Sequence, residues 1–439
     1  MAGSISSRIL RLGLPILIGQ LGQIVVGFAD TAMVGRYSTE ALASASFVNN
    51  LFNVAIFAGL GFAYGLTPLV GALYSRGRSR RIGALMRSAV IVNLLFALLL
   101  TAIMLTVYFN LHRLGQPPEL LPLIRPYFLI VLAGMIPLTL FNVFAQWSYA
   151  INRTSMPMWI ILSANAVNIL GNYLLIYGHW GFPELGLDGA GIATLTARVI
   201  CCTAIIVIFF CRRPFRFFRR GFLQCRATMA DIRQINVTSW PVSLQMAFES
   251  GSFTVVAVMA GWIGAIALAS YQVTVMLGTL GFCVYYSMGA AVSVLVSNAA
   301  GFHDRRLMRA TAFSGYRIML ILAACSSMIF IFGGRTIMSV FTDDPQVLAL
   351  SLTLIVPLVL YQLGDATQIT FANALRGTAR VMPMLWISLV CYVVVGIPAT
   401  YLLAFTAGLG LYGLILSFSV SLFLAGALFL YFFLRATRR

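Results

Sequence analysis

Long apolar stretches recur along the chain at intervals of roughly 30 residues and are separated by short polar connections. Each stretch supplies the ~20 apolar residues that a helix needs to cross a membrane. Several are longer, which favours tilted or bent helices over straight rods. The pattern predicts twelve membrane-spanning helices, near 9–35, 42–73, 84–110, 122–150, 156–178, 187–210, 235–261, 266–299, 308–333, 347–376, 382–406 and 409–434.

The composition points to an all-α integral membrane protein. Hydrophobic residues make up 60% of the 439 residues and charged residues only 9%, whereas soluble domains are ~45–50% apolar. The longest polar connection, about 211–234, leaves no room for a separate soluble domain. The N-terminal segment runs without a cleavage-site pattern into a full-length apolar stretch, so we expect it to be the first helix rather than a removed signal.

The net charge of +18 comes entirely from arginine, because the chain contains no lysine. With the N-terminus placed inside, twenty-four of the 29 arginines fall in inside segments. The others are Arg36, Arg113, Arg125 and Arg335 outside and Arg198 within a span. This bias is the positive-inside rule, and it predicts an even number of spans with both termini cytoplasmic. The same placement argues against nucleic-acid binding.

The two halves of the chain repeat each other at an offset of 226 residues. The matches are Pro15 with Pro241, the ALAS segments 41–44 and 267–270, and the MPM segments 156–158 and 382–384. Six spans in each half give both halves the same direction through the membrane, as in secondary transporters with parallel repeats. We expect an N-lobe at 1–210, a basic cytoplasmic linker at 211–234 on anionic lipid headgroups, and a C-lobe at 235–439.

Three of the eleven acidic residues lie inside apolar stretches: Asp30, Glu249 and Asp365. A carboxylate near the bilayer centre costs roughly 2.5–3.5 kcal/mol, so such a residue is a functional-site candidate. The alternative is that each one only forms an interhelical hydrogen bond. Three such residues in a chain with so few acids favour the functional interpretation.

Polar residues accompany Asp30 in the first half. Asn168 and Asn172 are four residues apart and therefore share one face of the fifth span, and Thr194 adds a hydroxyl from the sixth. The two amides can coordinate a cation or donate to a carboxylate, or they can simply hold helices together. Arg198, near the middle of the sixth span, either pairs with a carboxylate or extends along a helix groove.

The second half combines two acids with a phenol. Tyr361 and Asp365 are also four residues apart, and Glu249 comes from another span. Two buried carboxylates hold one proton between them unless a cation sits between them. Protonation and sodium binding, with Na⁺ at Glu249 and Asp365, are therefore alternatives at this site.

Motifs of enzymes and of cofactor binding are missing from the sequence. It contains no H-E-x-x-H, no G-x-S-x-G and no P-loop pattern, and its three histidines sit at span ends. The seven cysteines show no metal-binding spacing, so we expect neither zinc nor disulfides. We therefore expect no enzymatic activity, no cofactor, and no use of ATP by this chain.

The segment 27–35, GFADTAMVG, resembles the first-helix signature of the multidrug and toxic compound extrusion (MATE) transporters of the MOP superfamily. Further segments are similar to the NorM-like branch of that family. They are Asn168, Asn172, the segments 177–178, 183–186 and 191–194, Phe248 with Glu249, and the segments 361–366 and 375–377. The resemblance covers essentially the whole chain and implies two pseudo-symmetric six-helix bundles.

The resemblance also implies antiport by a monomer in a bacterial inner membrane, in which cationic amphipathic drugs leave while Na⁺ or H⁺ enters. Asp30, Asn168, Asn172 and Thr194 then correspond to an N-lobe cation or substrate site. Glu249, Tyr361 and Asp365 correspond to a C-lobe site. The alternative is a lipid-linked precursor flippase or metabolite exporter on a related scaffold. Such a protein would line its cavity with basic residues, whereas Arg198 is the only mid-span arginine.

Overall fold

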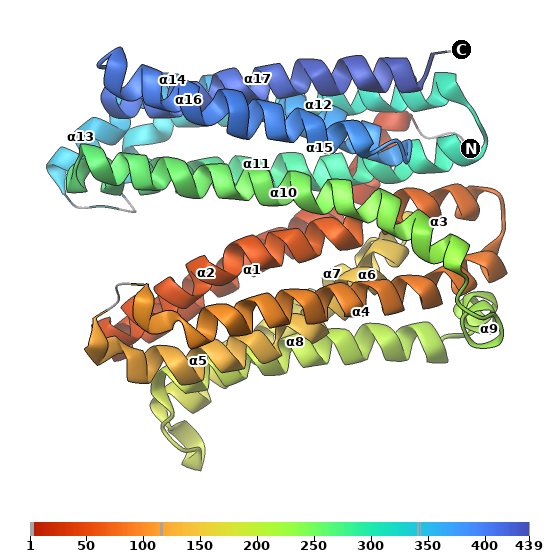
Figure 1. Cartoon of the computed structure of the whole chain (residues 1–439), viewed down its shortest axis with the longest axis horizontal. Coiled ribbons are helices and arrows are strands. Elements are labelled where there is room, and N and C mark those ends of the chain that lie inside the picture. Colours follow the sequence, from red (N-terminus) through yellow and green to blue (C-terminus); the bar gives the residue numbers. More distant parts are fainter. Residues whose placement is uncertain (1–3, 115–116, 340–341, 343, 439) are drawn as a thin grey trace. The chain divides into compact units, whose positions relative to one another are not determined.

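The computed structural model describes residues 4–114, 117–339, 342 and 344–438, and these residues form helices with no strand among them (Figure 1). The helices of the first half are α1 (Ile5–Tyr37), α2 (Thr39–Tyr64), α3 (Leu66–Ser75), α4 (Ser79–Phe109), α5 (Leu121–Ala133), α6 (Met135–Ala150), α7 (Ser155–Tyr177), α8 (Gly186–Cys211) and α9 (Arg216–Gln224). The second half contains α10 (Met229–Ile263), α11 (Ala265–Gly301), α12 (Arg305–Met338), α13 (Pro345–Thr353), α14 (Ile355–Gly377), α15 (Met382–Ser388), α16 (Ile397–Tyr401) and α17 (Gly410–Ala436). Two π-helical segments, η5 (Leu389–Gly396) and η6 (Leu402–Thr406), flank α16.

Within the described residues, eleven helical segments are long and apolar enough to cross a membrane. The pair α13 and α14, bent by 52° at its break, makes a twelfth when it is counted as one span. Each predicted stretch corresponds to one of these segments. The predicted all-α membrane fold with twelve spans is therefore confirmed.

Three spans are broken where a proline follows. The residues at the breaks are Gly65, Gly134 and Leu354. Pro68, Pro137 and Pro357 each stand three residues further on. Proline lacks an amide hydrogen, and its ring clashes with the carbonyl four residues earlier, so the ordinary helical bond is lost at each break. Proline does not always interrupt the helix, since Pro15 and Pro241 lie inside the continuous helices α1 and α10.

Contacts divide the chain into two compact units. The N-terminal unit is Ile18–Ser243, and the C-terminal unit combines Met1–Leu17 with Leu244–Arg439. The two boundaries, in α1 and in α10, are 226 residues apart, which is the offset of the sequence repeat. The start of α1 thus belongs to the C-terminal unit, and the start of α10 belongs to the N-terminal unit. The lobe boundaries predicted at 210 and 235 follow the repeat and the basic connection, and they remain a prediction.

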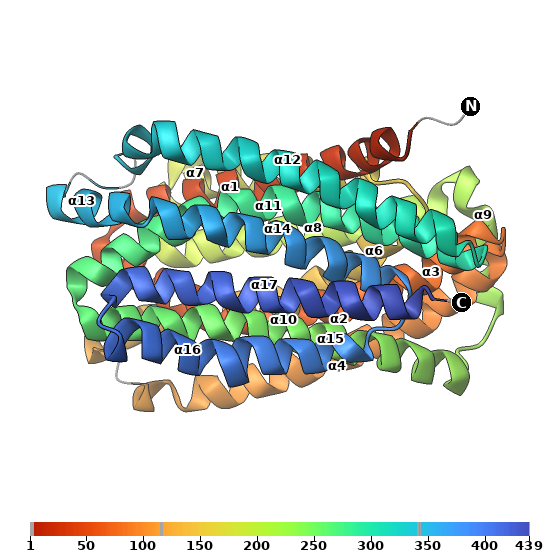
Figure 2. The ribbon, with the colours of Figure 1, turned by 90° about the horizontal axis from the view of Figure 1, so that it is seen from above.

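The C-terminal unit is organised around α14. This helix packs against α11, α12 and α17, and the four run side by side in Figures 1 and 2. Most of α14 is buried, including Tyr361 and Asp365. Asp365, one of the two predicted acids of the second half, therefore sits on a largely enclosed helix.

In the N-terminal unit, the basic connection folds into the short helix α9, which packs against the start of α4. The two backbones meet at Gly83 and Gly221, because a Cβ on Gly83 would overlap the Phe218 carbonyl oxygen. Arg87 on α4 donates to the carbonyls of Leu223 at 3.4 Å and Cys225 at 2.9 Å. The segment expected to act as a linker is thus a packed part of the unit, and its contact with lipid remains a prediction.

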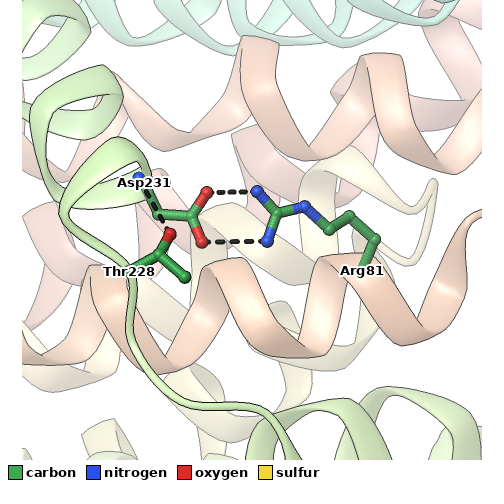
Figure 3. A network of polar contacts seen from close by, with 3 residues as sticks. All are labelled: Arg81, Thr228 and Asp231. Carbon is green, nitrogen blue, oxygen red and sulfur yellow. Dashed lines mark hydrogen bonds and ion pairs between the residues drawn. The ribbon is translucent and has the colours of Figure 1, made fainter.

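An ion pair fixes the start of α10 to α4 (Figure 3). Both guanidinium nitrogens Nη1 and Nη2 of Arg81 donate to the carboxylate of Asp231. Asp231 is 1% exposed, and its backbone amide donates to the Thr228 hydroxyl at 3.2 Å. Thr228 and Asp231 are spaced as in a helix N-terminal capping box. Charge pairing and capping together determine where α10 begins.

We expect Arg81→Met to lower the melting temperature of the purified protein, because it leaves the Asp231 carboxylate buried without its partner. A hydrogen bond to a charged group contributes about 1.5–3 kcal/mol. Arg81 is 45% exposed, which places the expected loss in the lower part of that range. The control is Arg78→Met, which changes an exposed arginine directly before α4. Equal melting temperatures for the two variants would show that the ion pair does not stabilise this junction.

Candidate functional site

Asp30, Asn168, Asn172 and Thr194 come together inside the N-terminal unit. Asp30 lies on α1, both asparagines on α7, and Thr194 on α8. Their four-residue spacing puts both asparagines on one face of α7, and the side chains are 2% and 0% exposed. The structure thus assembles the predicted group, while its role in binding remains a prediction.

Both asparagine amides donate a hydrogen bond to the same carboxylate oxygen of Asp30. Asn172 Nδ2 donates to Asp30 Oδ1. In the amide orientation that matches donors to acceptors, Asn168 donates to Asp30 Oδ1 at 2.9 Å and accepts from the Thr194 hydroxyl at 3.2 Å. The amide oxygen of Asn172 is buried and accepts no hydrogen bond from the described residues. One edge of the Asp30 carboxylate is therefore held by α7, and the site still has an unsatisfied acceptor.

Tyr177 secures the geometry of this cluster. Its hydroxyl donates to the backbone carbonyl of Met33 at 2.8 Å and so joins the end of α7 to α1. Its ring also packs edge-on against Tyr37 at 6.5 Å between centroids. The contacts hold the two helices in register one turn beyond Asp30. The carboxylate is therefore positioned by packing as well as by its own hydrogen bonds.

Arg198 lies on α8, four residues after Thr194. A Cβ on Gly134 would come within 2.8 Å of its Nη1, so the guanidinium fits against the break between α5 and α6. It interacts electrostatically with Asp30 and with Tyr127. No ion pair joins it to a carboxylate among the described residues. Of the two predicted roles, direct pairing with a carboxylate is not what the structure shows.

Glu249, Tyr361 and Asp365 form a second cluster in the C-terminal unit. Glu249 comes from α10, and the other two from one face of α14. The two carboxylates interact electrostatically with each other and with the Tyr361 hydroxyl. Gln245, one turn before Glu249, donates to Glu249 Oε2 at 2.9 Å. The structure assembles this predicted group as well, and its function too remains a prediction.

Several polar atoms around Asp365 have no hydrogen-bond partner among the described residues. They are Asp365 Oδ2, both amide atoms of Gln362 and the hydroxyl of Tyr392. Asp365 is 1%, Gln362 0% and Tyr392 2% exposed. An unsatisfied buried polar group costs about 1–3 kcal/mol. Such a concentration of unpaired atoms around two acids is typical of a site that binds an ion or ordered water.

Sequence reasoning missed two members of this second cluster, Gln245 and Tyr392, and the unpaired amide of Gln362 on the same helix as Asp365. Gln245 could have been found, since a spacing of four residues from Glu249 places it on the same helix face. Gln362 is adjacent to Tyr361 in the sequence but turned toward α11, where it lies against Gly281. Tyr392 carries no sequence signal, because only the packing of the eleventh span brings it to the acids.

These features define a class of protein: a multi-span membrane protein with two related halves and, in each, a polar cluster that contains an acid within a span. Comparison with known proteins then identifies the family to which the chain belongs. The sequence model of the MatE family matches residues 15–174 and 241–402, so it covers both halves at the offset of 226 residues. The chain belongs to the MatE family of transporters, and within it to the NorM-like branch.

The relatives are similar over nearly their whole length. A probable multidrug resistance protein NorM of Bradyrhizobium diazoefficiens is 31% identical over 434 residues, covering 98% of this chain and 93% of the relative. A probable NorM of Geobacillus kaustophilus is 30% identical over 437 residues, covering 98% and 95%. Among solved structures, a MOP superfamily transporter from Pyrococcus furiosus superposes with a TM-score of 0.86 at 17% identity, covering 99% and 96%. This last similarity concerns the fold.

Proposed function

We propose that the chain is a secondary active multidrug efflux transporter that exports cationic amphipathic compounds in exchange for entering Na⁺. The observation that carries the proposal is the pair of polar clusters, each with an acid inside a membrane span, in a chain of the MatE family. Its relatives are named multidrug resistance proteins, which supports drugs as the substrate class. Carboxylates within apolar helices attract cations that carry apolar groups and select against anions.

The ion enters through the C-lobe cluster. Glu249, Tyr361 and Asp365 present oxygen atoms, which are the ligands that hard cations prefer. The unpaired Asp365 Oδ2 is the atom that gains most from a bound cation, because no protein donor serves it in the described residues. A proton carrier needs one titrating acid, whereas two acids and a phenol provide a coordination shell. We therefore assign Na⁺, rather than H⁺, to this cluster.

Asp30 contributes proton coupling or substrate binding in the N-lobe. Of its two carboxylate oxygens, Oδ1 accepts hydrogen bonds from the amides of α7. In the described residues Oδ2 accepts none and is available to a proton or a cationic group. Arg198 adds a positive charge within electrostatic range. That charge favours release of a cation once Asp30 is protonated.

Exchange follows when drug and coupling ion use the same acids, since occupancy by one disfavours the other. A cation that enters down a ~100 mV potential contributes about 2.3 kcal/mol per charge before any concentration gradient. Alternating access of the two related halves is the general mechanism on such scaffolds. Drug accumulation in a pump-deleted host, with sodium and pH varied separately, tests the proposal.

We expect Asp365→Asn and Glu249→Gln each to raise drug accumulation to the level of cells without the transporter. Both changes remove a charge with almost no change in shape, so membrane insertion should be unaffected. Glu119→Gln, at an exposed position outside the spans, serves as the control and should leave efflux intact. Resistance near the unmutated level in both site variants, at equal expression, would remove the C-lobe cluster from the mechanism.

We further propose that both termini and the 211–234 segment are cytoplasmic in a bacterial inner membrane. In the N-terminal unit, the arginines at the start of α4 lie beside α9 and the start of α10. In the C-terminal unit, Arg305 donates to the Arg438 carbonyl at 2.8 Å, and Arg309 donates to Thr437 Oγ1 at 2.9 Å. Each unit thus gathers arginines at one end, as the positive-inside rule requires.

Cysteine labelling tests this orientation. In a cysteine-free variant, Arg220→Cys should resist a membrane-impermeant maleimide added to intact cells, and Leu114→Cys should react. Both side chains are exposed, so access depends only on the side of the membrane. After the cells are permeabilised, both positions should label equally. Ready labelling of Arg220→Cys in intact cells would invert the proposed topology.

A further inference from the structure

The eleventh span changes helix type twice along its length. It begins as α15, widens into the π-helix η5, returns briefly to α16 and widens again in η6. A π-helix bonds over five residues instead of four, and such segments are frequent at functional sites. Pro398 favours the first widening, because its ring displaces the carbonyl of residue 394 from ordinary helical bonding.

Gly396 permits the widened turn to pack. A Cβ at this position would lie 2.8 Å from the Cys391 carbonyl oxygen and 3.0 Å from the Ser421 hydroxyl oxygen. Both distances are shorter than ordinary van der Waals contact. A residue without a side chain is therefore required where η5 approaches α17. This close approach also fixes the rotation of η5, which determines where Tyr392 points.

Tyr392 projects from η5 toward the acids. It interacts electrostatically with Glu249, Asp365 and Tyr361, so its ring reaches the C-lobe cluster from a third element. Its hydroxyl is buried without a hydrogen-bond partner in the described residues, and so is Asp365 Oδ2. The two residues thus interact electrostatically, while neither oxygen is hydrogen-bonded in the described residues. A cation between them would use both oxygens.

Tyr392 also lines a small cavity. Its polar lining comes from Ser252 on α10, Tyr392 on η5, Thr400 on α16 and Ser421 on α17. Ser252 donates to the Glu249 carbonyl at 2.8 Å, and Thr400 donates to the Gly396 carbonyl at 2.7 Å. The cavity is therefore built onto the backbone of the residues that frame the site. The cavity has room for a single water-sized species, so an ion that enters it exchanges its waters for these hydroxyl oxygens.

We propose that Tyr392 supplies a further oxygen ligand to the sodium ion bound by Glu249 and Asp365, and that the ion reaches these two acids through the hydroxyl-lined cavity. The inference rests on the proposed function, since it takes the C-lobe cluster as the cation site. It adds to the two acids a further oxygen ligand, carried by a π-helical segment, and a path by which the ion reaches the site. The π-helical segment η5 then orients Tyr392, on the eleventh span, toward helices α10 and α14.

The test is equilibrium binding of radioactive sodium to the purified full-length protein. Tyr392→Phe removes one oxygen and keeps the ring, so we expect the dissociation constant for sodium to rise roughly five-fold or more, as loss of one hydrogen-bond-sized contact implies. Tyr401→Phe is the matched control: this tyrosine lies on the same span, is 50% exposed, and should bind sodium as the unmutated protein does. Asp365→Asn should abolish binding.

Two further readouts separate a ligand from a merely structural tyrosine. Loss of a ligand should change the order of preference among Li⁺, Na⁺ and K⁺, while sodium-free drug binding and the melting temperature stay as they were. Ser421→Ala, in the wall of the cavity, should slow sodium binding in stopped-flow measurements more than it weakens binding at equilibrium.

The outcomes are distinguishable. If Asp365→Asn abolishes sodium binding but Tyr392→Phe binds sodium with unchanged affinity and selectivity, the C-lobe site stands and the role of Tyr392 is refuted. If sodium affinity falls together with drug binding and melting temperature, Tyr392 is structural and the inference fails. If the unmutated protein binds no sodium that Asp365→Asn removes, the proposed cation site fails, and the inference fails with it.

Discussion

Polar atoms inside a membrane span have no bulk water to bond with, and this constraint shapes both acidic clusters. In the N-lobe, two amides of α7 converge on Asp30 Oδ1, while the buried amide oxygen of Asn172 accepts no hydrogen bond from the described residues. In the C-lobe, the atoms around Asp365 remain unpaired in the described residues. A span can retain such atoms only if something else satisfies them during the working cycle. The two clusters therefore differ in how far the protein's own donors satisfy their acids.

The arrangement of helices follows from small residues and prolines at specific points. Gly83 and Gly221 allow α4 and α9 to touch through their backbones, and Gly396 allows η5 to approach α17. The breaks three residues before Pro68, Pro137 and Pro357 free backbone groups that a straight helix would bond. The unit boundaries in α1 and α10 differ by the repeat offset. Duplication therefore preserved the way in which each unit incorporates part of the other half's first helix.

Much of this arrangement could be predicted from the sequence. The spans follow from length and apolarity, and the face shared by Asn168 and Asn172 follows from helical periodicity. Other features depend on packing between segments that are distant in the sequence. The docking of α9 on α4 was not predicted from the arginine-rich composition of 211–234. Phe218 on α9 and Phe215 just before it are buried against Trp147. The π-helical segment that carries Tyr392 and the position of Arg198 beside Gly134 could not be predicted from the sequence either.

The central claim is that a sodium gradient drives efflux through the C-lobe acids. The most direct measurement uses liposomes containing the purified protein, with a sodium gradient imposed at constant pH and with no proton gradient. The account predicts that drug moves against its gradient while sodium flows down its own, and that drug movement stops when the sodium gradient collapses. Drug movement that ignores sodium and follows an imposed proton gradient would contradict the account and would transfer the essential role to Asp30.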